Sequence, residues 1–164
     1  MLRINDVYQY QDLSIRILKI LSEHIVWIDI NDVKALPEII SKTELFHAIE
    51  SFEVFRIEDP FQDIAFIQPE KDSTSQRKRD ENYNLIKNIV DHEQFYIPSA
   101  RSSLINEIIN SKKSTKQTIY RLLRQYWQRG QTPNALIPNY QNSGAKGSKK
   151  VASQKLGRKR LYKE

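Results

Sequence analysis

The first third of the chain alternates apolar and polar positions in the manner of β-strands. Residues 13–21 and 24–30 are rich in Ile and Val and alternate in part, and only Ser22 and Glu23 separate them. Apolar side chains at every second position place one face of a strand in a core, and a short connection joins antiparallel neighbours. We therefore expect these two segments to form a β-hairpin.

The pattern changes to helical spacing at residues 38–51, after Pro37, which is a common residue at helix starts. The apolar positions of this segment lie in or near one stripe and are Ile39, Ile40, Leu45, Phe46 and Ile49. A stripe of this kind predicts an amphipathic helix that packs on the hairpin.

Residues 52–58 are predicted to form a further strand, which Asp59–Pro60 ends. The apolar residues of 61–67 add either an edge strand or an apolar anchor. Together these elements predict a small, acidic, strand-rich α+β unit over residues 1–68.

A polar stretch at residues 69–79 has no apolar residue apart from Pro69 and is predicted to be a linker. The chain after it has helical spacing. A first helix is expected at residues 80–91, with a stripe of Tyr83, Ile86, Ile89 and Val90. A second helix is expected to be capped by Ser99, with a stripe of Leu104, Ile105, Ile108 and Ile109.

A third helix is expected to follow a short polar turn. Ser114 and Gln117 have the spacing of a capping box, so this helix should start at about Thr115, and Gly130 should end it. About four residues join the second helix to the third, which is the helix-turn-helix pattern. The sequence therefore predicts an all-α helix-turn-helix domain over residues 80–131, although a three-helix bundle without a DNA-binding role has the same pattern.

Charge is distributed unevenly along the chain. The formal net charge is +6, but residues 1–70 carry a net −7 and residues 71–164 a net +13. Between the acids Glu107 and Glu164 there are fourteen Lys and Arg residues and no acid. A purely basic stretch of this length indicates a polyanionic partner, and nucleic acid is the commonest one.

The third helix has two distinct faces. A core face is predicted from apolar residues at helical spacing, namely Ile119, Leu122, Leu123 and Tyr126. A polar stripe is formed by Gln117, Arg121, Arg124 and Gln128, and the helix contains no acid. Gln pairs with adenine edges and Arg with guanine, so this stripe is typical of a recognition helix. Trp127 is expected to pack in the core, with base stacking as the alternative.

Beyond the helix, Pro133 should prevent further helix, and residues 132–164 contain three of the four glycines and the basic cluster 157–160. We expect an extended basic arm that is disordered without DNA and that enters a minor groove; an unrelated disordered tail is the alternative. The candidate DNA-contacting residues of helix and arm are Ser114, Thr115, Lys116, Gln117, Thr118, Tyr120, Arg121, Arg124, Gln128, Arg129, Lys146, Lys149, Lys150, Arg158, Lys159 and Arg160.

Other classes of site find no support in the composition. The chain has no cysteine, and its three histidines are scattered without the spacing of metal ligands. No apolar run is long enough to cross a bilayer, and the N-terminus lacks the apolar segment of a signal peptide. We expect a cytoplasmic protein with no catalytic residue, metal, small-molecule ligand or membrane partner of its own.

A long, specific run of residues resembles a known family. Residues 120–147, YRLLRQYWQRGQTPNALIPNYQNSGAKG, resemble the corresponding segment of TnsB-type transposases, the DDE-family strand-transfer subunits of bacterial cut-and-paste transposons. Further similar stretches are INDV near the start, RIL at 16–18, IVWIDI at 25–30, EDP at 58–60 and QRKRDENYNLI at 76–86. The resemblance runs along essentially the whole chain.

The resemblance implies an N-terminal fragment that recognises repeated sites on double-stranded DNA at transposon ends. Members of the family are several times longer, and their RNase H-like domain with the Asp-Asp-Glu metal site comes later in the chain. Mg²⁺ and strand transfer are therefore expected only of that missing domain. Companion endonuclease and ATPase subunits of the transposition machinery are further candidate partners, and the location is the bacterial nucleoid when the protein is bound to DNA.

Two other functions stay open on the sequence alone. The acidic unit of residues 1–68 could make the chain a protein-interaction module that recruits other transposition subunits. A stand-alone helix-turn-helix regulator is a second alternative, although the sequence shows no heptad for dimerisation. RNA binding is disfavoured because no aromatic-rich strand motif accompanies the basic stretch.

Overall fold

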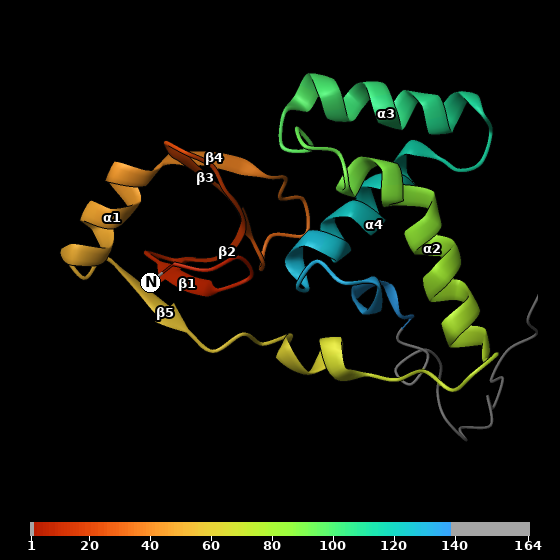
Figure 1. Cartoon of the computed structure of the whole chain (residues 1–164), viewed down its shortest axis with the longest axis horizontal. Coiled ribbons are helices and arrows are strands. Elements are labelled where there is room, and N and C mark those ends of the chain that lie inside the picture. The colour runs from red at the N-terminus through yellow and green to blue at the C-terminus, as the bar shows by residue number, and fades with distance from the viewer. Residues whose placement is uncertain (1, 139–164) are drawn as a thin grey trace, which may run out of the picture.

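The computed structural model describes residues 2–138 and shows a curled antiparallel sheet beside a group of helices (Figure 1). The sheet has five strands in the order β4-β3-β2-β1-β5. In chain order the elements of this part are β1 (Val7–Tyr10), β2 (Leu13–Ile20), β3 (His24–Asp29), β4 (Glu38–Ser41), α1 (Lys42–Glu50) and β5 (Val54–Ile57). The predicted α+β class is confirmed, and so is the hairpin, which β2 and β3 form.

Helical elements make up the rest of the described chain. They are the 3₁₀ helix η1 (Gln62–Phe66), α2 (Thr74–Val90), α3 (Pro98–Asn110), α4 (Lys116–Gln128) and the 3₁₀ helix η2 (Pro133–Leu136). Helix α4 contacts α2, α3 and β3, so it joins the helices to the sheet (Figure 1). Within residues 2–138 no helix is long and apolar enough to cross a membrane.

Apolar side chains are buried on both faces of the sheet. The inner cluster, between the sheet and α1, comprises Tyr8, Ile15, Ile17, Ile25, Leu45, Ala48 and Val54. The outer cluster joins Leu18, Val26 and Ile28 of the sheet to apolar side chains of α2, α3 and α4. Because successive side chains of a strand point to opposite faces, neighbours such as Ile25 and Val26 enter different clusters. The outer cluster is therefore a core that the sheet shares with α2, α3 and α4.

Residues 38–51, which we expected to be a single helix, divide into a strand and a helix. Ile39 and Ile40 belong to β4, which pairs with β3. Their β-branched side chains favour extended backbone where a neighbouring strand is available. The helix α1 begins after Ser41, whose hydroxyl accepts a hydrogen bond from the Glu44 amide at 3.3 Å.

Residues 61–67, expected to be an edge strand or an apolar anchor, and the predicted linker after them both contain helical turns. Residues 61–67 contain η1 and no strand. Helix α2 begins at Thr74, and the Ser73 hydroxyl caps it by accepting a hydrogen bond from the Gln76 amide at 3.1 Å. Residues 74–79 of the predicted linker are therefore the first turns of α2, because a capped N-terminus lets polar residues extend the helix.

Helix α3 begins just before the predicted cap. Pro98 lies in the first turn and Ile97 is the N-cap residue, which makes no side-chain hydrogen bond. The fixed backbone angle of proline suits this position, where its missing N–H loses no intrahelical hydrogen bond. Ser99 thus lies inside the helix and does not cap it.

The chain turns sharply at the end of α4. Gly130 has a φ of +102°, and the amide of Gln131 donates a hydrogen bond to the Tyr126 carbonyl at 2.9 Å. This bond spans five residues and is the one of the two Schellman hydrogen bonds with the larger sequence separation. The motif requires a residue in the left-handed conformation, such as glycine. The predicted role of Gly130 as the residue that ends the helix is confirmed.

The first residues of the predicted arm are packed against the helices. Pro133 starts η2 and does not prevent further helix, and Ala135 and Leu136 are buried. The expectation of an extended arm from residue 132 is therefore wrong for residues 132–138, because two apolar side chains there complete the core. Residues 139–164, which hold the remaining arm positions, lie outside the described residues.

Candidate nucleic-acid interface

Helix α4 buries one face in the outer cluster. Its buried side chains are Ile119, Leu122, Leu123, Tyr126 and Trp127, which confirms the predicted core face. The Trp127 ring is fully buried and lies 5.6 Å from the Phe95 ring, centroid to centroid. Trp127 therefore packs in the core, and base stacking is excluded for it in this fold.

The N-terminal half of α4 presents a basic surface to solvent. Lys116, Gln117 and Arg121 are exposed, and neither Lys116 nor Arg121 forms an ion pair with a carboxylate of residues 2–138. Lys112 and Lys113, in the turn before the helix, are also exposed. Sequence reasoning missed these two lysines, although their place in an acid-free stretch could have indicated them. Five exposed polar groups, four of them cationic, thus gather around the start of α4.

The hydroxyl groups at the start of α4 are engaged in capping. Thr115 is the N-cap residue, and its Oγ1 accepts a hydrogen bond from the Thr118 amide at 3.3 Å and donates one to Thr118 Oγ1 at 3.0 Å. The expected capping box of Ser114 and Gln117 is therefore wrong by one residue. Thr115, and not Ser114, caps the helix. The exposed side-chain amide of Gln117 makes no capping hydrogen bond and is therefore free to contact a partner.

The polar stripe changes character halfway along α4. The Arg124 guanidinium lies 5.4 Å from the centroid of the Tyr120 ring, and Arg124 Nε donates a hydrogen bond to the Ala35 carbonyl at 3.3 Å. Both Arg124 and Tyr120 are partly buried. These two candidate residues therefore lie at the boundary between the exposed surface and the sheet.

The last candidates on the helix face the sheet or the chain after it. Gln128 Nε2 donates hydrogen bonds to the carbonyls of Asp29 and Asp32, at 2.9 and 2.7 Å. Arg129 is partly buried with its guanidinium 5.7 Å from the centroid of the Phe61 ring, and burial lowers the pKa of this guanidinium. The structure thus places Gln128 against the sheet and Arg129 beside Phe61, and both are partly buried, unlike the exposed Lys116, Gln117 and Arg121.

A buried arginine of the sheet holds the end of α4. Arg16 of β2 is fully buried and donates to both carboxylate oxygens of Asp59, at 2.8 and 2.5 Å. Its remaining hydrogen bonds go to the carbonyls of Asn5 and Gln128, each at 3.0 Å. A cation at the C-terminus of a helix is favourable because the free carbonyls there carry partial negative charge. The sheet therefore fixes the position of α4 through a buried, charged group that makes four hydrogen bonds.

A second buried arginine lies between α3 and α4. Arg101 of α3 is 3% exposed, donates to the Phe95 carbonyl at 3.0 Å and lies 6.0 Å from the Trp127 ring centroid. Burial lowers the pKa of its guanidinium. Sequence reasoning missed Arg101 and Arg16, because a charged residue in a helix or strand is expected to be exposed unless its partners are known.

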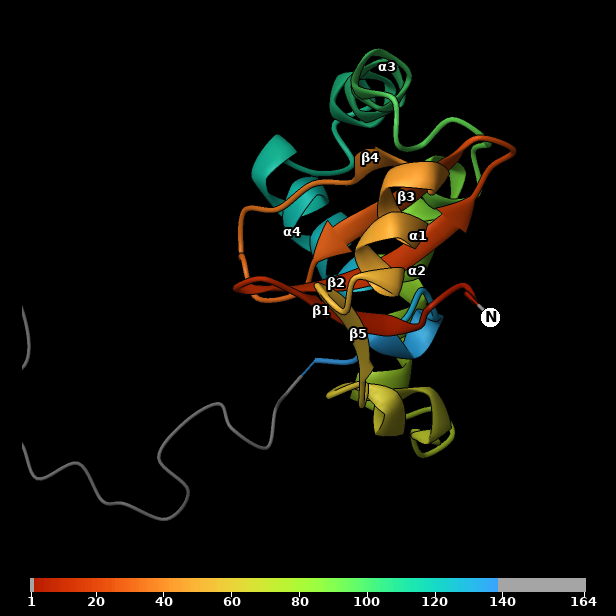
Figure 2. The ribbon, with the colours of Figure 1, turned by 90° about the vertical axis from the view of Figure 1, so that its left-hand side faces the viewer.

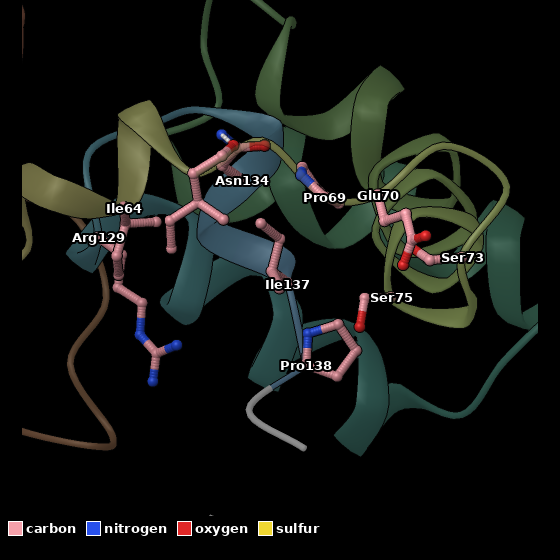
Figure 3. A pocket seen from close by; sticks show the side chains of 10 residues that line it. Ile64, Pro69, Glu70, Ser73, Ser75, Arg129, Asn134, Ile137 and Pro138 are labelled. Carbon is pink, nitrogen blue, oxygen red and sulfur yellow. Dashed lines mark hydrogen bonds between the residues drawn. The ribbon is translucent and has the colours of Figure 1, made fainter. Parts of the chain in front are cut away.

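A cleft of about 470 Å³ lies between η1, η2 and the start of α2 (Figure 3). Arg129 lies at one end of it and Glu70 and Ser73 at the other, with Ile64 and Ile137 among the apolar residues between them. Residues 2–138 bring together no group of three acidic or histidine side chains that could hold a metal ion.

Comparison with known proteins gives two matching family models and a curated relative. The model described as the TnsB N-terminal SH3-like domain matches residues 1–60, and the one described as the TnsB second domain matches residues 79–140. The chain is 39% identical over 164 residues to the Transposon Tn7 transposition protein TnsB of Escherichia coli. This match covers 99% of the chain and 23% of that relative, so the chain spans about a quarter of its length.

Proposed function

Because the chain belongs to the TnsB family, whose N-terminal SH3-like and second domains it carries, we propose that it binds double-stranded DNA at transposon ends in a sequence-specific manner. The observation that carries this proposal is the exposed, acid-free N-terminal half of α4, with Lys116, Gln117 and Arg121 directed away from the core. A helix of this kind fits the major groove of B-DNA, where each base pair presents a distinct pattern of donors and acceptors.

The exposed side chains divide into two roles in this proposal. Arg121 and Gln117 read base edges, since Arg pairs with the O6 and N7 atoms of guanine and Gln with adenine. Lys112, Lys113 and Lys116 contact phosphates, since a lysine is a flexible point charge without a fixed hydrogen-bonding fork. Tyr120 and Arg124 lie at the edge of this surface, where Arg124 packs on the Tyr120 ring and donates a hydrogen bond to the Ala35 carbonyl.

The basic residues beyond the described part complete the proposal. Lys146, Lys149, Lys150, Arg158, Lys159 and Arg160 lie in residues 139–164, and their contact with a neighbouring groove stays a prediction. Their charge would add to the salt dependence of binding whichever groove they occupy.

The chain's proposed part in transposition is to place DNA and not to cut it. In this proposal, metal-dependent strand transfer belongs to the region that follows the two matched domains in longer members of the family. The setting is the bacterial cytoplasm. Companion endonuclease and ATPase subunits would then meet the chain on the DNA that it holds. Contact between these subunits and the acidic N-terminal unit is an alternative use of that unit.

Footprinting on an end of the transposon that encodes the chain tests the proposal. We expect protection of discrete repeated sites at concentrations that leave a scrambled duplex of equal length unprotected. Uniform protection of both duplexes would reduce the function to non-specific DNA binding. No protection of either would favour the protein-interaction alternative.

A further inference from the structure

The segment between β3 and β4, residues 31–37, continues the polar surface of α4. Arg124, from the polar stripe, donates to the Ala35 carbonyl, and Gln128 donates to the carbonyls of Asp29 and Asp32. The stripe that is exposed at Gln117 therefore passes directly onto this segment of the N-terminal sheet. The two views of the ribbon agree that the β3–β4 segment lies beside α4 (Figures 1 and 2).

The β3–β4 segment is anchored at both ends and exposed between them. Ile30 before it and Pro37 at its end are buried, and Leu36 packs on the outer cluster. Val33 is 78% exposed and Lys34 is also exposed. The middle of the segment thus projects from a fixed base, with a lysine next to the residue whose carbonyl holds Arg124.

A duplex that accepts α4 must pass close to this segment. Helix α4 has 13 residues and is therefore about 20 Å long, at roughly 1.5 Å per residue. The major groove is about 12 Å wide, so a helix lying in it has a phosphate backbone along each side. The segment contacts α4 at Arg124 and Gln128, so a backbone that runs along the C-terminal half of a groove-bound α4 would pass its exposed middle.

The segment carries one exposed cation, Lys34. Lys34 forms no ion pair with any carboxylate of residues 2–138. The two neighbouring acids are turned to the backbone: Asp32 Oδ1 accepts from the Lys34 amide at 2.8 Å, and Asp29 Oδ1 accepts from the Asn31 amide at 2.9 Å. The amides are neutral, so both carboxylates keep their charge, and Lys34 is the one cation of residues 31–37.

We propose that Lys34 of the SH3-like domain contacts a DNA phosphate beside the groove that α4 enters, so that the acidic N-terminal unit is itself part of the DNA-binding surface. This inference rests on the proposed function, since it needs α4 to meet DNA first. It assigns to the N-terminal unit a contact that its net negative charge would not indicate. The contact adds affinity and orientation without reading sequence.

Binding of the full chain to labelled duplexes tests the proposal through salt dependence. One duplex carries the end of the encoding transposon and the other is a scrambled version of the same length. Lys34→Ala is expected to weaken binding to both duplexes by the same factor and to lower the slope of log affinity against log salt by about 1, as loss of one phosphate contact does. Lys34→Glu should weaken both further. Lys42→Ala, which removes a lysine of α1 on the inner side of the sheet, is the matched control and should change neither quantity.

A chemical probe locates the contact. The chain has no cysteine, so Lys34→Cys and Lys42→Cys each provide a single thiol for attachment of an iron–EDTA cleavage reagent. The reagent at position 34 is expected to cleave the end duplex next to the site protected by the protein, and the reagent at position 42 is expected to leave it intact. Equal cleavage, or none, from both positions would overturn the inference.

Arg121→Ala, measured in parallel, distinguishes failure of the proposed DNA binding by α4 from failure of the contact by Lys34. If the unaltered chain fails to bind, or Arg121→Ala binds as well as the unaltered chain, the proposed function fails. If Arg121→Ala weakens binding while Lys34→Ala and Lys34→Glu behave as Lys42→Ala does, only the contact by Lys34 fails. Thermal unfolding of each variant identifies any loss that comes from misfolding.

Discussion

Arg16 in the second strand donates a hydrogen bond of 3.0 Å from its Nε atom to the main-chain carbonyl of Gln128 in the last turn of α4. The two residues are 112 positions apart in the chain, and the arginine is fully buried. This bond, together with the ion pair between Arg16 and Asp59, ties the proposed recognition helix to the N-terminal sheet. The orientation of α4 therefore depends on residues that never meet DNA.

Arg16→Ala is expected to lower the free energy of unfolding by roughly 3–5 kcal/mol, because it leaves the partly buried carboxylate of Asp59 and two carbonyls without their donor. Urea denaturation measures the change. Lys78→Ala, which breaks the exposed pair of Lys78 with Glu81, is the control and should cost less than about 1 kcal/mol. A loss for Arg16→Ala as small as that of the control would show that the buried network contributes little.

Two glutamines of the same polar stripe are expected to behave in opposite ways. Gln128→Ala should lower the free energy of unfolding by about 1–2 kcal/mol, since two carbonyl acceptors, those of Asp29 and Asp32, lose their donor. Gln117→Ala should stay within about 0.5 kcal/mol of the unaltered chain because Gln117 is exposed. Gln117→Ala should instead reduce the preference for the end duplex over a scrambled one. Equal effects of the two variants on stability would contradict this division.

Gly130→Ala is expected to destabilise the fold by about 1–2 kcal/mol, because the residue has a φ of +102° that an L-residue with a Cβ rarely adopts. Space is not the cause, since the nearest atom to an added Cβ would be Arg16 Nη1 at an ordinary 3.7 Å. Thermal and urea unfolding both report the change. Unaltered or higher stability would show that the turn after α4 adopts another backbone conformation.

The stability of the chain should fall at high pH through Tyr126. Burial chiefly, helped by Tyr83 and Asp91, raises the pKa of the Tyr126 hydroxyl to about 12, against an ordinary value of 10.0. Because the pKa is higher in the folded state, protonated Tyr126 favours the folded chain over the unfolded chain at high pH. Its contribution to the free energy of unfolding is complete below about pH 10 and is lost as the pH rises through about 12. Urea unfolding between these values should show a smaller fall for Tyr126→Phe, which cannot ionise. The same fall in both proteins would assign the pH dependence to other groups.

The sequence predicted those elements whose pattern is set locally. Alternating Ile and Val residues predicted the hairpin of β2 and β3, and the apolar spacing of α4 predicted its buried face down to Trp127. Gly130 was identifiable because few other residues end a helix in this way. These features depend on the residue types of one segment and not on what lies opposite.

The features that escaped prediction depend on partners far away in the chain. Ile39 and Ile40 fit a helical stripe as well as they fit a strand. They form the strand β4 because β3 is available to pair with it. Gln128 has the spacing of a solvent-facing residue, yet carbonyls of the β3–β4 segment accept its hydrogen bonds. Arg16 is buried because Asp59 and Gln128 satisfy its donors, and neither partner is visible from the sequence of β2. The split of the polar stripe into exposed and sheet-facing halves follows from such contacts.

The specificity ratio of the chain and its Arg121→Ala variant tests the central claim most directly. The ratio is the affinity for the end duplex divided by that for a scrambled duplex, measured at one salt concentration. We predict that Arg121→Ala, by removing a guanidinium from a base edge, weakens binding to the end duplex by about 1–3 kcal/mol while affinity for the scrambled duplex changes little. Arg77→Ala, an exposed arginine on α2, should leave both affinities unchanged. An equal loss on both duplexes, or no loss on either, would contradict recognition of transposon ends by α4.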